Sequence, residues 1–142
     1  MTEQDIRWVQ RFDNFKRAFL VLENAVSVES PSVLEQGGII QFFEMTFELS
    51  WKLLKDYQEM KGATVKYSRD VLKQAFQSDL IGNGHDWIQA LEDRNLMSHT
   101  YNESVSIEVV KKIKNKYFPL LSELRDTFQA KLDGLPDNLE EE

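Results

Sequence analysis

Residues 8–26 read WVQRFDNFKRAFLVLENAV. The apolar side chains of this stretch follow one another at spacings of 4, 3, 4, 3 and 4 residues: Trp8, Phe12, Phe15, Phe19, Leu22 and Val26. Since an α-helix has about 3.6 residues per turn, this spacing sets all of these side chains on one face. The stretch therefore predicts a long amphipathic helix over about residues 5–26, packed along one side against the rest of the chain.

The segments that follow also have the helical period. A second helix is predicted from about Ser32 or Gly38 to residue 61, and Gly62 is expected to be its C-terminal cap. Its apolar residues cover two faces, which predicts packing between two neighbours or between one neighbour and a second subunit. A short third helix is predicted over residues 68–80, with Ser68 as its N-cap.

Two more helices complete the chain. Asp86 is expected to cap a fourth helix that runs up to about His99. A long last helix is predicted from about residue 104 to residue 132, and Pro119 should kink it or split it near Tyr117, because proline lacks the amide proton that a helix interior needs.

These elements predict an all-α fold, an antiparallel helical bundle like a four-helix bundle but with about five helices. At 142 residues the chain has the length of one domain, and no alternating apolar pattern indicates a strand. We place this domain at residues 1–134. The rest, residues 135–142, is rich in carboxylates and is expected to be a disordered acidic tail.

The composition excludes several kinds of chemistry. There is no cysteine, so disulfides, thiolate zinc sites and cysteine nucleophiles are ruled out. Neither His85 nor His99 has a glutamate three residues before it, so we expect no di-iron site, no other metal site and no cofactor. The first residues contain no apolar signal core and no apolar run approaches a membrane span, so we expect a cytoplasmic protein that does not interact with membranes.

The net charge of −7 argues against a broad basic surface for long nucleic acids, although a small basic cleft stays compatible with it. Lysines concentrate in residues 110–117, which read VKKIKNKY. This run is either a solvated helix face or a local patch that attracts RNA.

The string Arg94-Asn95-Leu96-Met97-Ser98-His99-Thr100-Tyr101 is the candidate for chemistry. On a regular helix Arg94 and His99 are separated by a rise of about 7.5 Å and an angle of about 140°, whereas Asn95 and His99 share a face. A site in a cleft at the end of the helix, within one chain or between two subunits, therefore fits better than a site along a helix face.

The residue types suit cleavage of RNA without a metal. His99 has a side chain that exchanges protons near neutral pH, and Arg94 offers a bidentate fork to a phosphate. Asn95 could orient the histidine or bind a phosphate oxygen, and Tyr101 could stack on a base or donate its hydroxyl. The composition alone leaves the ordinary alternative open, in which these are surface groups and the histidine complements the helix dipole.

Three acidic residues are candidates for a supporting role. Glu44 and Glu48 lie one helical turn apart, either as part of a charged surface with Lys52 or as polar groups at a cleft or dimer interface that pair with Arg94. Asp93 directly precedes Arg94 and is expected to pair with it or with a neighbouring lysine.

Two stretches resemble a known family. Residues 93–102, DRNLMSHTYN, resemble the signature of the HEPN superfamily, and within it the HepT-like nucleotidyltransferase substrate-binding proteins. Residues 41–55, QFFEMTFELSWKLLK, resemble the second-helix pattern of the same group. The resemblance covers about residues 3–132, and the two stretches together are much more specific than the Arg-x4-His pattern alone.

The resemblance implies a homodimeric helical bundle in which the Arg-His motifs of two subunits lie near each other in a cleft. It further implies a toxin that cleaves RNA without a metal, and a partner, a minimal nucleotidyltransferase, that silences it by transferring AMP to a tyrosine. Carried over by position, Arg94 and His99 would be catalytic, Asn95 supporting, and Tyr101 the acceptor of AMP. The alternative is a non-catalytic subunit that binds nucleotide or substrate for the nucleotidyltransferase, and the sequence does not separate the two.

Overall fold

The computed structural model of the protein describes residues 2–97 and 103–136, and in the second range it describes side chains from residue 106 onward. The elements are α1 (Glu3–Val26), α2 (Val33–Met60), α3 (Ser68–Gln77), α4 (Gly84–Met97), α5 (Glu103–Lys112), the π-helical segment η1 (Ile113–Tyr117) and α6 (Phe118–Asp133). The described residues contain no strand, and the predicted all-α fold is confirmed.

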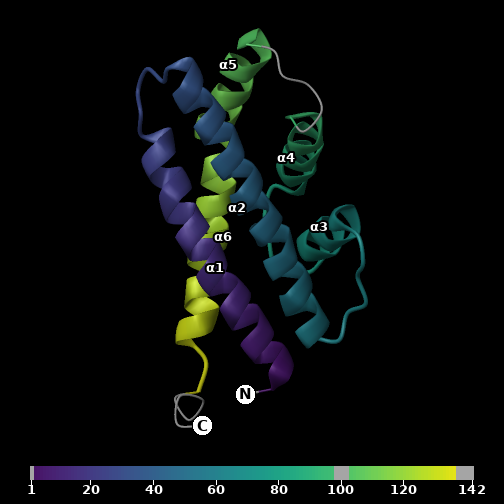
Figure 1. The fold of residues 1–142 in the computed structure, drawn as a ribbon. Helices are drawn as coiled ribbons and strands as arrows, with labels where there is room; N and C mark the ends of the chain where they lie inside the picture. Colours follow the sequence, from purple (N-terminus) through teal and green to yellow (C-terminus); the bar gives the residue numbers. More distant parts are fainter. Residues whose placement is uncertain (1, 98–102, 137–142) are drawn as a thin grey trace.

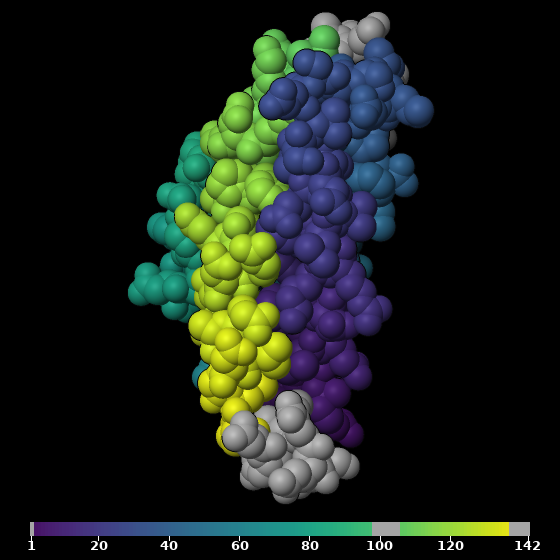
Figure 2. Space-filling model, turned by 90° about the vertical axis from the view of Figure 1, so that its left-hand side faces the viewer, coloured from purple at the N-terminus to yellow at the C-terminus, as the bar shows by residue number. Residues whose placement is uncertain are grey.

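Figure 1 shows the path of the chain. α1 rises from the N-terminus, α2 descends beside it, α3 and α4 return along α2, and α5, η1 and α6 descend as one continuous rod. This is the arrangement of a four-helix bundle in which two short helices, α3 and α4, take the place of one long one. α1 packs most extensively on α2, and α6 packs along α1. Figure 2 shows that contact from outside, with the yellow-green rod against the purple helix.

Capping boxes fix where the two longest helices begin. Thr2 accepts a hydrogen bond from the Asp5 amide through its side chain while Asp5 accepts one from the Thr2 amide, so α1 begins at Glu3. Ser32 and Glu35 make the same reciprocal pair, so α2 begins at Val33. Of the two starts that the sequence allowed for the second helix, the structure therefore has the one at Ser32.

Two predicted caps are wrong, the first by one residue and the second by three. Ser68 is the first residue of α3, and Tyr67 stands at the cap position without a side-chain hydrogen bond. α4 begins at Gly84, because Asn83 takes a left-handed conformation (φ 53°) and its carbonyl accepts the amide of Trp87. Asp86 therefore lies inside the first turn of α4, where its carboxylate pairs with Lys116 at 3.4 Å.

The last rod changes its helical register where the sequence predicted a break. η1 ends at Tyr117, and the amide of Phe118 bonds the carbonyl of Ile113, five residues back. Pro119 then stands in the first turn of α6, where its missing amide proton costs little. A widened turn thus accommodates the proline, and the chain continues as a helix.

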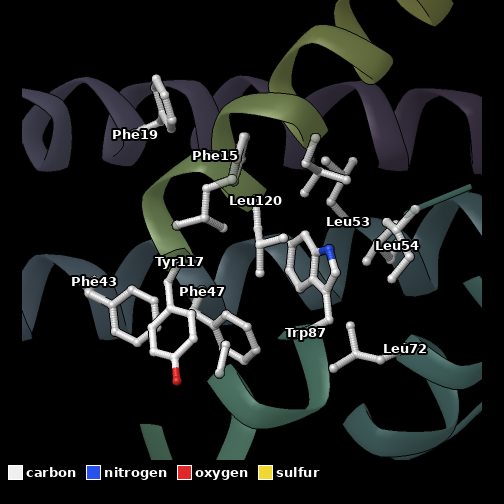
Figure 3. Packing of buried hydrophobic residues seen from close by; sticks show 14 of the residues in the cluster. Phe15, Phe19, Phe43, Phe47, Leu53, Leu54, Leu72, Trp87, Tyr117 and Leu120 are labelled. Carbon is white, nitrogen blue, oxygen red and sulfur yellow. The ribbon is translucent and has the colours of Figure 1, made fainter. Parts of the chain in front are cut away.

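The core is rich in aromatic side chains, as the spacing in residues 8–26 predicted. The predicted face of α1 is buried at Trp8, Phe12, Phe15, Phe19 and Leu22. Figure 3 shows how the rings and aliphatic side chains of α1, α2 and α4 gather around the rod at its middle. Among the described residues, no helix combines the length and the apolar content that a membrane crossing needs.

Substitution of glycine by alanine is expected to have opposite effects on stability at two positions, one after α2 and one inside it. Gly62 follows the helix with φ +95°, and the amide of Ala63 bonds the carbonyl of Gln58 at 2.9 Å, so Gly62→Ala should cost about 1 kcal/mol of stability. Gly37 lies inside the helix, where an added methyl group would meet only open space, so Gly37→Ala should add about 0.5–1 kcal/mol. The midpoints of urea unfolding should move in opposite directions. A loss of stability in both variants would contradict the prediction.

Candidate functional site

Arg94 lies in the last turn of α4 and its guanidinium faces α2. Its Nη2 lies 2.8 Å from Oε2 of Glu48, and both side chains are about two-thirds buried, with 29% and 31% exposed. Both contacts that the sequence suggested for Glu48 are present, because it pairs with Arg94 and also with Lys52. Partial burial makes the Arg94–Glu48 pair stronger than one at the open surface.

Two further residues of α2 hold the carboxylate of Glu48. Trp51 donates its indole N–H to Oε2 at 3.0 Å, and the ammonium of Lys52 lies 3.3 Å from Oε1. Partial burial acts to raise the pKa of Glu48, but the Trp51 hydrogen bond and the charges of Arg94 and Lys52 outweigh it, so the pKa lies below its ordinary value. Glu48 is therefore ionised at neutral pH and gives Arg94 a fixed anionic partner.

Asp93, the residue before Arg94, faces the α5 and η1 part of the rod, whereas Arg94 faces α2. Its Oδ2 accepts a hydrogen bond from the hydroxyl of Tyr117 and lies 3.6 Å from the ammonium of Lys112. Of the two expected partners of Asp93, the structure thus has the neighbouring lysine. Burial first, and then the hydrogen bond to the Asp93 carboxylate and its charge, raise the pKa of Tyr117 well above its ordinary value. The hydroxyl therefore stays protonated and keeps donating.

A cavity of about 670 Å³ opens beside these residues, between α2, α4 and α5. Its lining includes the carboxylates of Glu44 and Asp93, the ammonium of Lys112, and the apolar side chains of Ile40, Met97 and Val109. This volume lies in the range of small-molecule sites. Because Glu44 lies one helical turn before Glu48 on α2, the cavity and the Arg94–Glu48 pair are neighbours on one face of that helix.

Most lysines in residues 110–117 form ion pairs or hydrogen bonds with neighbouring parts of the fold. Lys112 pairs with Asp93, Lys114 donates to the carbonyl of Val28, and Lys116 binds both Asp86 and Gln89. Lys111 is exposed. Three of these ammonium groups therefore join the rod to α4 or to the segment after α1, so the run is more than a plain solvated helix face, and its attraction for RNA stays a prediction.

The structure places only part of the predicted Arg-His-Tyr set. Asn95 is exposed next to Arg94, with its Oδ1 3.5 Å from the Arg94 Nη1. His99 and Tyr101 lie outside the described residues, as does the acidic tail from residue 137. Within the described part of the chain, no three histidine or carboxylate groups gather closely enough to hold a metal ion.

Sequence reasoning missed the contact that Tyr117 makes with Asp93. Pro119 gave a signal for a change of backbone near Tyr117, but nothing in the sequence indicated which residue the hydroxyl would meet. Nothing in the sequence indicated the hydrogen bond from the Trp51 indole N–H to Glu48 either.

Comparison with known proteins gives consistent matches. Residues 10–130 match the model of the family described as "Nucleotidyltransferase substrate binding protein like". A Haemophilus influenzae protein described as "Probable ribonuclease HepT" is 31% identical over 91 residues, which cover 58% of this chain and 62% of that protein. The aligned part thus spans less than two-thirds of the relative.

Solved structures with the same fold include two that cover most of this chain. A Thermus thermophilus protein is 27% identical with a TM-score of 0.70, over 83% of this chain and 98% of its own. A chain from a mutant of the MntA–HepT toxin–antitoxin pair also has a TM-score of 0.70, over 87% of this chain and 97% of its own. At 15% identity, this second likeness concerns the fold alone.

Proposed function

Since the chain belongs to the nucleotidyltransferase substrate-binding protein-like family, we propose that it is a HepT-like toxin, a homodimer that cleaves RNA without a metal and pairs with a minimal nucleotidyltransferase. The observation that carries this proposal is the partly buried guanidinium of Arg94, held 2.8 Å from a carboxylate beside a cavity. A carboxylate and a phosphate present similar oxygen pairs to arginine. A guanidinium that is oriented to bind a carboxylate is therefore also oriented to bind a phosphate.

The chemistry follows from the residue types at this end of α4. His99 takes the proton of a 2′-hydroxyl, the 2′-oxygen attacks the phosphorus, and the 5′-oxygen leaves with a proton from an acid at the site. The products are a 2′,3′-cyclic phosphate and a 5′-hydroxyl. Arg94 stabilises the negative charge that grows on the phosphate oxygens, and Asn95 supports the phosphate or the histidine. Asp93, Glu44 and Glu48 line or orient the site.

Regulation would occur at Tyr101, two residues after His99. Transfer of AMP to its hydroxyl by the nucleotidyltransferase would place a phosphodiester next to Arg94 and His99. That group would occupy the arginine and exclude the phosphate of RNA by charge and by volume. The family resemblance is the support for this part of the proposal.

The test is cleavage of a mixed RNA in EDTA. Unmodified wild-type protein, shown by intact mass to carry no AMP, should cleave, and His99→Ala should lower the rate by about 100-fold or more. Protein that carries AMP on Tyr101 should be inactive, whereas Tyr101→Phe should stay active after incubation with the nucleotidyltransferase and ATP. Absence of cleavage by the unmodified protein would favour the alternative, a non-catalytic subunit that binds substrate for the nucleotidyltransferase.

A further inference from the structure

The π-helical segment η1 brings two residues of the rod to the same carboxylate oxygen. On a regular α-helix Lys112 and Tyr117 would point about 140° apart. In η1 the amide of Phe118 bonds five residues back, which winds more residues into the turn. As a result the Tyr117 hydroxyl and the Lys112 ammonium both meet Oδ2 of Asp93.

Tyr117 is fixed where it stands. Only 1% of the residue is exposed, and its ring stacks on Phe43 of α2 with the ring centres 5.5 Å apart. Figure 3 shows the ring beside Phe43 and Phe47, with the hydroxyl pointing away from the buried side chains around it. The hydroxyl is therefore a donor at a place set by the core and not by a flexible side chain.

The last described turn of α4 is held from two sides. Asp93 binds the rod through Tyr117, and the next residue, Arg94, binds α2 through Glu48. Further back on α4, Lys116 of η1 binds Asp86 and Gln89. The end of a helix has carbonyls without intrahelical partners and frays readily, so contacts of its side chains determine where its last turn lies.

We propose that Tyr117, acting through Asp93, is a positioning residue that sets the direction in which Arg94 points. The contact with Glu48 is the part that the structure shows, and the consequence for phosphate chemistry rests on the proposed function. In a variant without the Tyr117 hydroxyl, Asp93 of α4 loses the hydrogen-bond donor that the core holds in place. The turn then shifts, and Arg94 spends less time against Glu48.

The test compares Tyr117→Phe with Tyr57→Phe, which removes a hydroxyl from another tyrosine that packs against the core. The first readout is the pKa of Glu48, followed by carbon NMR of its side-chain carboxyl through a pH titration. Because the charge of Arg94 helps to lower this pKa, it should rise in Tyr117→Phe toward the value in Arg94→Ala. It should not change in Tyr57→Phe. An unchanged Glu48 pKa in Tyr117→Phe overturns the inference, whether or not the protein cleaves RNA.

The second readout is RNA cleavage. In Tyr117→Phe we expect kcat to fall about 10- to 100-fold with little change in KM, since misplacing a reacting group by about 1 Å has effects of this size. If the wild-type protein cleaves no RNA, the proposed function fails, while the Glu48 titration still decides on the positioning role. A wild-type kcat in Tyr117→Phe together with a raised Glu48 pKa would overturn the link to phosphate chemistry.

Substitutions of Asp93 separate positioning from folding. Asp93→Asn keeps an oxygen that accepts from Tyr117, so the Glu48 pKa should stay close to that of the wild type, and kcat should fall less than in Asp93→Ala. Asp93→Ala removes the acceptor and should reproduce the changes of Tyr117→Phe. Equal defects in Asp93→Asn and Asp93→Ala would contradict positioning through this hydrogen bond. Thermal unfolding of each variant verifies that the fold is kept.

Discussion

Arg94→Ala is expected to lower the rate of RNA cleavage by about 100- to 1,000-fold, the loss typical when one group that stabilises the charge of a transition state is removed. The guanidinium lies at the end of α4 with Glu48 2.8 Å away, so in the proposed reaction it would already be oriented. Alanine leaves no donor there for the phosphate oxygens. The measurement is single-turnover cleavage of a short RNA in EDTA, with helical content verified by circular dichroism.

Two further variants show whether the cleavage rate depends on the planar, bidentate geometry of the guanidinium or on its positive charge. Arg94→Lys keeps the positive charge but loses the planar, bidentate geometry, so its rate should stay well below that of the wild type. Lys52→Met removes the positive charge that lies 3.3 Å from the Glu48 carboxylate and leaves the Arg94 guanidinium in place. It should change the rate only a fewfold. Similar losses in Lys52→Met and Arg94→Ala would show that the rate depends on overall charge and not on Arg94 itself.

The fold was predictable because its main signals are local. The spacing of aromatic residues from Trp8 to Phe19 needs only a helical period to indicate a buried face, and those residues are buried. Gly62 marks the end of α2, and Pro119 marks the change of helical register near Tyr117, for backbone reasons that hold in any context. The start of α4 was predicted less well, since it depends on the conformation of Asn83 and not on the capping tendency of Asp86.

The site was predictable only where chemistry restricts the choice of partner. Arginine needs an anion when half-buried, and Glu48 was among the carboxylates proposed for Arg94. The hydrogen bond from Tyr117 to Asp93 joins residues that are 24 positions apart and depends on the register of η1. Likewise, the lysines of the rod look like a basic surface in the sequence, and only the packing of α4 against the rod reveals their carboxylate partners.

Phe128→Ala is expected to cause the largest loss of stability among the changes considered, about 3–5 kcal/mol. Phe128 of α6 is 0% exposed, and its ring meets those of Trp8, Phe12 and Tyr57 at centre distances of 5.2–5.9 Å. Alanine would leave a cavity among rings from two helices, α1 and α2. For a domain of this size the loss corresponds to a decrease of the melting temperature by about 10–15 °C, which differential scanning calorimetry would measure.

Phe76→Ala is the matched control, because the same atoms are removed from a side chain that is 50% exposed. It should cost about 1 kcal/mol, since half of the ring already contacts water. Tyr57 lies nine residues after Glu48 on α2, about 13 Å along the helix, so the cavity left by Phe128→Ala is remote from Arg94. Below its melting temperature the Phe128→Ala protein should therefore keep the Arg94–Glu48 contact and the low pKa of Glu48. Equal losses of stability in the two variants would contradict the packing of α6 on α1 and α2 on which the whole bundle depends.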